Sequence, residues 1–132
     1  MNAPERTPFA RFGGEVPVKE LVERFYDVMD EREPALAALH EREGDKVSRT
    51  ARDRFALFLI GWLGGPQTYM ERHGHPRLRM RHARVPVTSA MRAAWLRCMH
   101  AALDGRAIPE NLRGFLHQRF AEVADFLVNQ PE

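Results

Sequence analysis

Apolar side chains recur at steps of three and four residues along four long stretches of the chain, and this periodicity limits the fold more than any other feature. Such spacing places apolar side chains on one face of an α-helix. It predicts helices over residues 18–31, 48–63, 89–103 and 109–129. Strict alternation of apolar and polar residues, which indicates a half-buried β-strand, is not sustained anywhere in the sequence. We therefore predict an all-α fold, and a plain helical bundle would also satisfy the pattern.

Glycine and proline separate the predicted helices. Gly13-Gly14 precedes the first long helix, and the Gly-Gly-Pro run at 64–66 ends the second. A short helix is expected at 34–40, because a proline at its first position loses no hydrogen bond there. The charged stretch 41–46 contains a glycine and is expected to be a loop, whereas 77–83 has room for one or two helical turns.

The bulk properties point to one domain and exclude several classes of protein. A chain of 132 residues suits a single domain, which we place at 13–132 after a loose arm at 1–12. No apolar run approaches the roughly 18 residues of a membrane span, and the start of the chain has no segment resembling a secretory signal. The single cysteine, Cys98, rules out an internal disulfide and favours a cytoplasmic protein. A formal net charge of +2 does not by itself imply a nucleic-acid partner.

Among six histidines, His82 has the most informative surroundings. No HExxH pattern or cysteine cluster supports a zinc site, and no GxSxG motif supports a serine hydrolase. His82 lies among apolar residues and four arginines, which are Arg77, Arg79, Arg81 and Arg84. A solvated charged face would explain the arginines. A flat apolar cofactor with carboxylate groups would explain both the arginines and the histidine, and haem is such a cofactor.

Three segments carry a specific resemblance to a known family. They are Gly-Gly-Pro-Gln-Thr-Tyr at 64–69, Gly-His-Pro-Arg-Leu-Arg-Met-Arg-His at 74–82 and Ala-Trp-Leu-Arg-Cys-Met-His at 94–100. Together they resemble group II truncated haemoglobins, and the similarity extends from about residue 9 onward. The resemblance implies a globin-like two-over-two helical sandwich that encloses haem b (iron protoporphyrin IX). The helix pair at 18–31 and 48–63 would cross the pair at 89–103 and 109–129.

The resemblance also implies roles for individual residues. His82 matches the proximal iron ligand, and Tyr26 and Trp95 match polar groups on the distal side. His40 is aligned with a third distal position. Ala51 stands where larger globins often carry a distal histidine, so no histidine gate is expected. The remaining contacts implied with the porphyrin or its propionates are Phe55, Phe58, Tyr69 and Arg79.

The function implied by the resemblance is reversible binding of a diatomic ligand such as O2, NO or CO at ferrous haem. Donors from Tyr26, Trp95 and His40 would each contribute roughly 1 kcal/mol. Two or three of them would slow O2 release by about 30- to several-hundred-fold. Slow release favours redox chemistry or sensing over transport, with nitric oxide dioxygenation and a reductase partner as one option. The alternatives are a haem peroxidase acting on peroxide and a haem-free helical interaction module. Both a monomer and a homodimer are compatible with the sequence.

Overall fold

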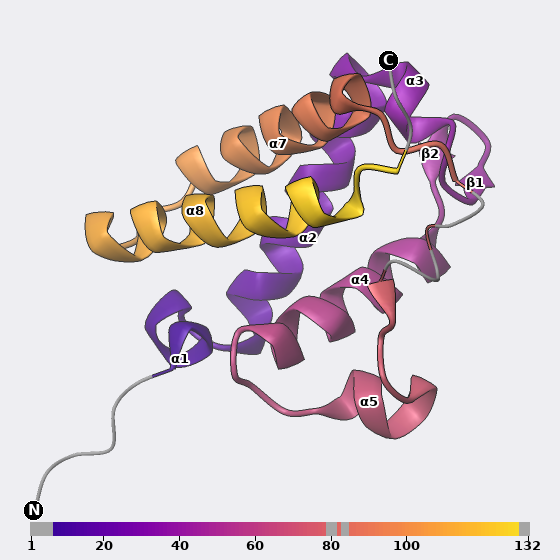
Figure 1. Cartoon of the computed structure of the whole chain (residues 1–132). Helices are drawn as coiled ribbons and strands as arrows, with labels where there is room; N and C mark the ends of the chain where they lie inside the picture. Colours follow the sequence, from indigo (N-terminus) through magenta and orange to yellow (C-terminus); the bar gives the residue numbers. More distant parts are fainter. Residues whose placement is uncertain (1–6, 79–81, 83–84, 130–132) are drawn as a thin grey trace, which may run out of the picture.

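The computed structural model describes residues 7–78, 82 and 85–129, and helices dominate it (Figure 1). The four long helices are α2 (Glu15–Arg32), α4 (Arg49–Trp62), α7 (Ser89–Asp104) and α8 (Glu110–Leu127). Three short helices are α1 (Pro8–Phe12), α3 (Pro34–Ala37) and α5 (Thr68–His73). The predicted helical fold is confirmed. One small difference is an antiparallel pair of two-residue strands, β1 (Arg42–Glu43) and β2 (Lys46–Val47), where a loop was expected.

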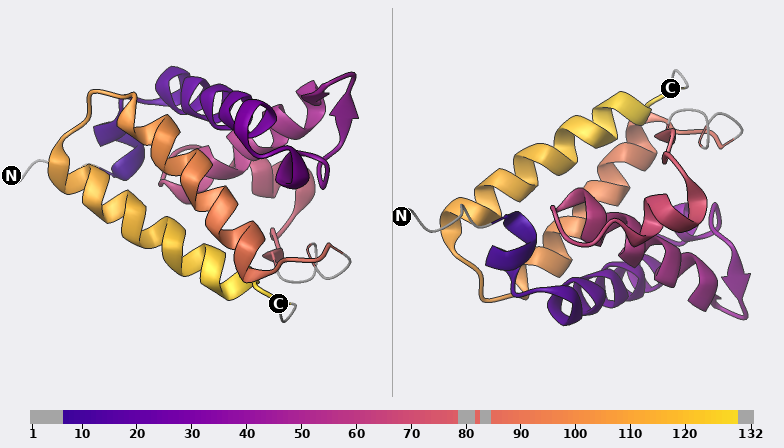
Figure 2. Two further views of the ribbon diagram at one scale, coloured as in Figure 1. Left: turned by 90° about the horizontal axis from the view of Figure 1, so that it is seen from above. Right: turned by 90° about the horizontal axis from the view of Figure 1, so that it is seen from below.

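The long helices form two layers. Figure 1 shows α7 and α8 side by side, with α2 crossing behind them and α4 below. The views from above and below in Figure 2 show the same arrangement. The helix α2 packs against both α4 and α7, so it joins the two layers. The largest fully buried side chains come from all four long helices and include Phe25, Leu59, Met99 and Leu116. This is the two-over-two arrangement that was predicted.

The prediction of a loose arm through residue 12 is wrong for residues 8–12. These residues form α1, which Thr7 caps by accepting a hydrogen bond from the Ala10 amide at 3.1 Å. Phe12 is buried, and Phe9 packs against the core. A side chain at Gly65 would meet the Phe9 ring at 2.8 Å, so only glycine permits this approach. The periodicity could not reveal α1, because one helical turn is too short to establish a repeat.

The helix α8 ends two residues earlier than the predicted limit at residue 129. Val128 has extended backbone angles, and the Asn129 amide donates to the Val87 carbonyl at 2.9 Å instead of continuing the helix. Asn129 is thereby brought beside the segment that carries His82. Within 77–83, the His82 amide donates to the Leu78 carbonyl at 3.1 Å, which is the bond of a single helical turn. No helix among the described residues is long and apolar enough to cross a membrane.

Candidate functional site

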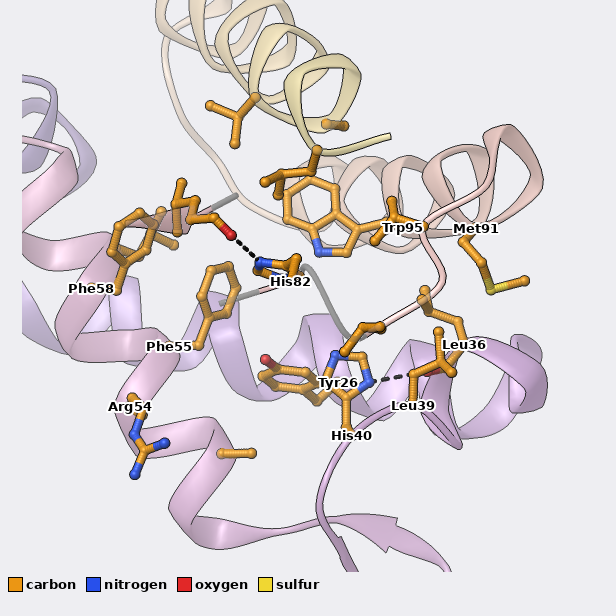
Figure 3. A pocket seen from close by; sticks show the side chains of 18 of the residues that line it. Tyr26, Leu36, Leu39, His40, Arg54, Phe55, Phe58, His82, Met91 and Trp95 are labelled. Atoms are coloured by element: carbon orange, nitrogen blue, oxygen red, sulfur yellow. Dashed lines mark hydrogen bonds between the residues drawn. The ribbon is translucent and has the colours of Figure 1, made fainter. Parts of the chain in front are cut away.

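A cavity of about 420 Å³ lies between the helical layers, with walls from α2, α4, α5, α7 and α8 (Figure 3). Its lining is mostly apolar, as is usual for a pocket that holds a small organic ligand. The aromatic residues of the lining are Tyr26, Phe55, Phe58, Trp62, Tyr69, Trp95 and Phe120. Two histidines, His40 and His82, also line it. Its volume falls within the range of about 300–1,000 Å³ for small-molecule and cofactor sites.

The structure brings seven of the eight predicted site residues together around this cavity. They are Tyr26, His40, Phe55, Phe58, Tyr69, His82 and Trp95. The eighth, Arg79, lies outside the described residues. Ala51 also lines the cavity, so its small side chain stands at the pocket wall. Residues more than fifty positions apart in the sequence therefore form one site.

The hydrogen bonding of His82 defines which of its ring nitrogens is available. Its Nδ1 lies 2.7 Å from the Leu78 carbonyl oxygen. A carbonyl can only accept, so Nδ1 must carry the proton and donate. In the neutral ring, Nε2 then has a free lone pair. The carbonyl of His82 in turn accepts a hydrogen bond from the Asn129 side chain at 3.0 Å.

Polar groups from α2 and α7 face the same space. Tyr26 is only 5% exposed, and its ring packs edge-on against Phe25 and Phe55. Burial raises the pKa of the Tyr26 phenol well above its ordinary value, and the charge of Arg52 works against that rise. The phenol therefore keeps its proton at neutral pH. Figure 3 shows the Trp95 indole nitrogen directed into the space that the rings of Tyr26, His40 and His82 surround.

His40 has a different hydrogen-bonding capacity from the one expected. Its Nδ1 lies 3.0 Å from the Leu36 carbonyl, so this nitrogen is the donor. Burial lowers the pKa of His40, and hydrogen bonds to Leu36 and Ala37 only partly oppose that effect. The ring is therefore neutral at pH 7, and Nε2 can accept a hydrogen bond but cannot donate one. The His40 ring makes an edge-on contact with the Tyr26 ring, at 5.6 Å between ring centroids.

Other candidate chemistry finds no support in the described part of the chain. No group of three histidine, cysteine or carboxylate side chains there is placed to hold a metal ion. Cys98 is fully buried, and burial raises the pKa of its thiol to about 11. A protonated buried thiol is a poor nucleophile, so Cys98 is part of the core.

Comparisons with known proteins agree with this geometry. The family model for bacterial-like globins matches residues 7–129. A group 2 truncated haemoglobin of Bacillus subtilis is 37% identical over 125 residues, which cover 95% of this chain and 90% of that protein. The crystal structure of the group II truncated haemoglobin of Bacillus anthracis has a TM-score of 0.90 at 34% identity, covering 98% of this chain and 96% of that one. The chain belongs to the group II truncated haemoglobins.

A second structural comparison covers the whole of both chains. The group II 2-on-2 haemoglobin of Agrobacterium tumefaciens has a TM-score of 0.88 at 33% identity, with 100% of each chain covered. Globins bind haem and small diatomic ligands such as O2, and the pocket of this truncated haemoglobin has the apolar lining and imidazole that such a cofactor requires.

The sequence did not identify two residues that matter for this pocket. Arg54 lines the cavity edge from α4 and has no ion pair within the described residues. Asn129 forms four hydrogen bonds at 2.9–3.1 Å with His82, Val85 and Val87. Arg54 follows the pocket-lining Ala51 by three positions, one helical turn, so its spacing was a usable signal. No local pattern marks Asn129, because its partners lie more than forty positions earlier.

Proposed function

We propose that the cavity binds haem b and that His82 Nε2 is the proximal iron ligand. The observation that supports this most directly is the 2.7 Å contact between His82 Nδ1 and the Leu78 carbonyl. It fixes the tautomer that leaves Nε2 free to bind a metal and orients the ring, as second-shell bonds do for ligating histidines. When bound, haem supplies the iron at which a diatomic ligand is held.

The lining of the cavity suits a flat apolar group with carboxylate edges. Phe55, Phe58 and Tyr69 offer aromatic surface to the porphyrin. Arg54 stands at the periphery in Figure 3, where it is exposed and can pair with a propionate. Arg79 is proposed as a second propionate partner from its place in the sequence.

On the distal side we propose that Trp95 and Tyr26 donate hydrogen bonds to the diatomic ligand. The indole nitrogen of Trp95 can only donate. The Tyr26 phenol can donate either to the ligand or to the neutral His40 ring. His40 would then accept a hydrogen bond from Tyr26 in competition with the ligand. It would not be the third donor that the sequence suggested. Two donors instead of three still slow release by about 30-fold or more.

Slow release makes redox chemistry or sensing a better role than bulk O2 transport. We propose that the protein handles O2, NO or related reactive species. A catalytic redox cycle at the iron needs an external reductant, so a reductase partner is part of this proposal.

The proposal is tested by replacing His82 with alanine and recording the visible absorption spectrum of the purified protein. We expect the variant to lose stable haem or to show an altered spectrum. The matched control is His73→Ala, because His73 is an exposed histidine near the same segment. A His82→Ala variant with wild-type haem content and spectrum would refute the assignment.

A further inference from the structure

A charged side chain is buried behind the distal wall of the pocket. Arg52, on α4, is 5% exposed, and it is the only charged residue among the buried residues that the structure describes. Its Nε donates to the Val47 carbonyl at 2.9 Å. Its two terminal nitrogens reach three carboxylates of α2, Glu23 at 3.0 Å, Asp27 at 2.8 Å and Asp30 at 2.9 Å. One guanidinium thus ties α4 to α2 and to β2.

A buried ion pair is by itself weak evidence for a gain in stability. Removing a charge from water is costly, and buried ion pairs can often be replaced by apolar residues without loss of stability. Many neighbouring positions on α2 and α4 are filled by apolar core residues. A planar guanidinium has several fixed donors, so it can define the orientation of the groups around it in a way that apolar packing cannot.

Arg52 contacts Tyr26, which lines the cavity. The Arg52 Cζ atom lies 5.7 Å from the centre of the Tyr26 ring, within the range of a cation–π contact. Two of the carboxylates that hold Arg52, Glu23 and Asp27, flank Tyr26 on the same helix. The aromatic neighbours of the ring are Phe25, Phe55 and His40, and its one cation–π contact within the described residues is with Arg52.

We propose that Arg52 is a positioning residue, which holds the Tyr26 ring so that its hydroxyl faces the ligand space. This inference rests on the proposed role of Tyr26 as a distal donor. Arg52 does not line the cavity and acts only through Tyr26. Lysine could not take its place, because an ammonium is a single point charge and lacks the planar fork that reaches several acceptors at once.

The first test reads the position of the Tyr26 ring without measuring activity. The chain has only two tyrosines, Tyr26 and Tyr69, so labelling with 3-fluorotyrosine gives two fluorine resonances that Tyr26→Phe assigns. In the haem-loaded ferrous protein with CO, we expect Arg52→Met to shift or broaden the Tyr26 resonance and to leave that of Tyr69 in place. Arg49→Met is the matched control, because Arg49 pairs with Glu23 and Asp53 at the surface and is 54% exposed.

The second test is a double-mutant cycle on O2 release. We expect Arg52→Met to accelerate release about fivefold, the scale of one weakened hydrogen bond. In a Tyr26→Phe background it should change release by less than about twofold, because the group through which it acts is gone. Arg52→Lys keeps the charge and is the second variant if Arg52→Met does not fold, and it should move the Tyr26 resonance as well.

Two results would overturn the inference. One is a Tyr26 resonance that stays in place in both Arg52 variants. The other is an Arg52→Met acceleration that remains undiminished in the Tyr26→Phe background. If Tyr26→Phe alone leaves O2 release unchanged while the Tyr26 resonance still moves in Arg52→Met, the proposed donor role of Tyr26 fails and the positioning by Arg52 stands.

Discussion

The distal wall of the pocket carries Tyr26 and Trp95, and the proximal wall carries His82. Different contacts hold the two walls in place. On the distal side, Tyr26 belongs to the 18-residue helix α2 and is fixed among core aromatic rings and the buried Arg52. On the proximal side, both the amide and Nδ1 of His82 bond to the Leu78 carbonyl. The His82 carbonyl accepts hydrogen bonds from the Val85 amide and from the side chain of the exposed Asn129. The bonds from Asn129 are exposed, and exposed hydrogen bonds belong to the less stable parts of a fold.

The two walls should therefore depend on the bound cofactor to different extents. Core packing sets the proposed donors, Tyr26 and Trp95, in place before any ligand arrives, which is the condition for a donor to act without reorganisation. On the proximal side, haem bound to His82 would add a link between the cofactor and this segment, so binding should contribute to the stability of the segment by linkage. Mutations on the distal wall should therefore alter ligand release, and mutations on the proximal wall should alter retention of the cofactor.

The largest effect is expected on the distal wall. Trp95→Phe keeps most of the apolar ring and removes one donor, so O2 release should accelerate about tenfold. Tyr26→Phe should have a smaller effect, because we propose that the Tyr26 phenol divides its hydrogen bond between the ligand and His40, whose ring it contacts. The two effects should be non-additive, since both donors share one ligand. The measurement is stopped-flow O2 dissociation on both single variants and the double variant. A Trp95→Phe rate within about twofold of wild type would remove the main support for a redox role.

The proximal wall is tested through Asn129. Asn129→Ala removes the three side-chain hydrogen bonds to His82, Val85 and Val87, and we expect haem transfer to an acceptor apoprotein to accelerate about fivefold. Asn129→Asp retains the acceptor for the Val87 amide but turns an oxygen toward two carbonyls, so its effect should be at least as large.

Asn111→Ala is the control for Asn129, because Asn111 also forms a side-chain hydrogen bond, with Arg11 at 2.7 Å, away from the pocket. If Asn129→Ala changes O2 release and leaves haem transfer unaltered, the division between the two walls is wrong.

A smaller effect is expected at the edge of the pocket. Arg54→Ala should accelerate haem transfer about twofold, because an exposed ion pair with a propionate contributes roughly 0–1 kcal/mol. Arg54→Lys should retain much of the effect of the charge. Arg72, an exposed arginine of α5 outside the cavity lining, provides the control variant Arg72→Ala. Equal transfer rates for Arg54→Ala and Arg72→Ala would mean that Arg54 has no specific contact with the cofactor.

The sequence predicted the parts of the site that lie in long periodic helices or in the specific motif around His82. Tyr26 and Trp95 are on apolar helical faces, and His82 lies within a recognisable segment, so all three could be named before the structure. Arg52 and Asn129 could not, because their importance depends on partners 22 to 47 residues away. Nothing local distinguishes Arg52 from the other arginines of the chain until α2 and α4 are packed together.

The hydrogen-bonding state of His40 likewise could not be predicted from the sequence, because it depends on which carbonyl its Nδ1 reaches. Burial lowers the pKa of His40 in the folded protein below the ordinary value of 6.5. The unfolded chain therefore binds a proton at a higher pH than the folded one. The contribution of the neutral ring to stability is fully present above about pH 6.5 and is lost as the pH falls toward the lowered folded pKa. For one group this loss is at most about 1.4 kcal/mol per pH unit.

Replacing His40 with glutamine should consequently flatten the decline in the free energy of unfolding between about pH 6.5 and 5. Denaturant unfolding of the haem-free and haem-loaded protein at several pH values measures this slope. The control is His73→Gln, since His73 is an exposed histidine outside the cavity lining. A His40→Gln variant whose stability falls as steeply as that of the wild type would mean that His40 takes up its proton without cost in the folded state. His40 would then be able to donate from Nε2, and the distal wall would regain the third donor that its bond to Leu36 now argues against.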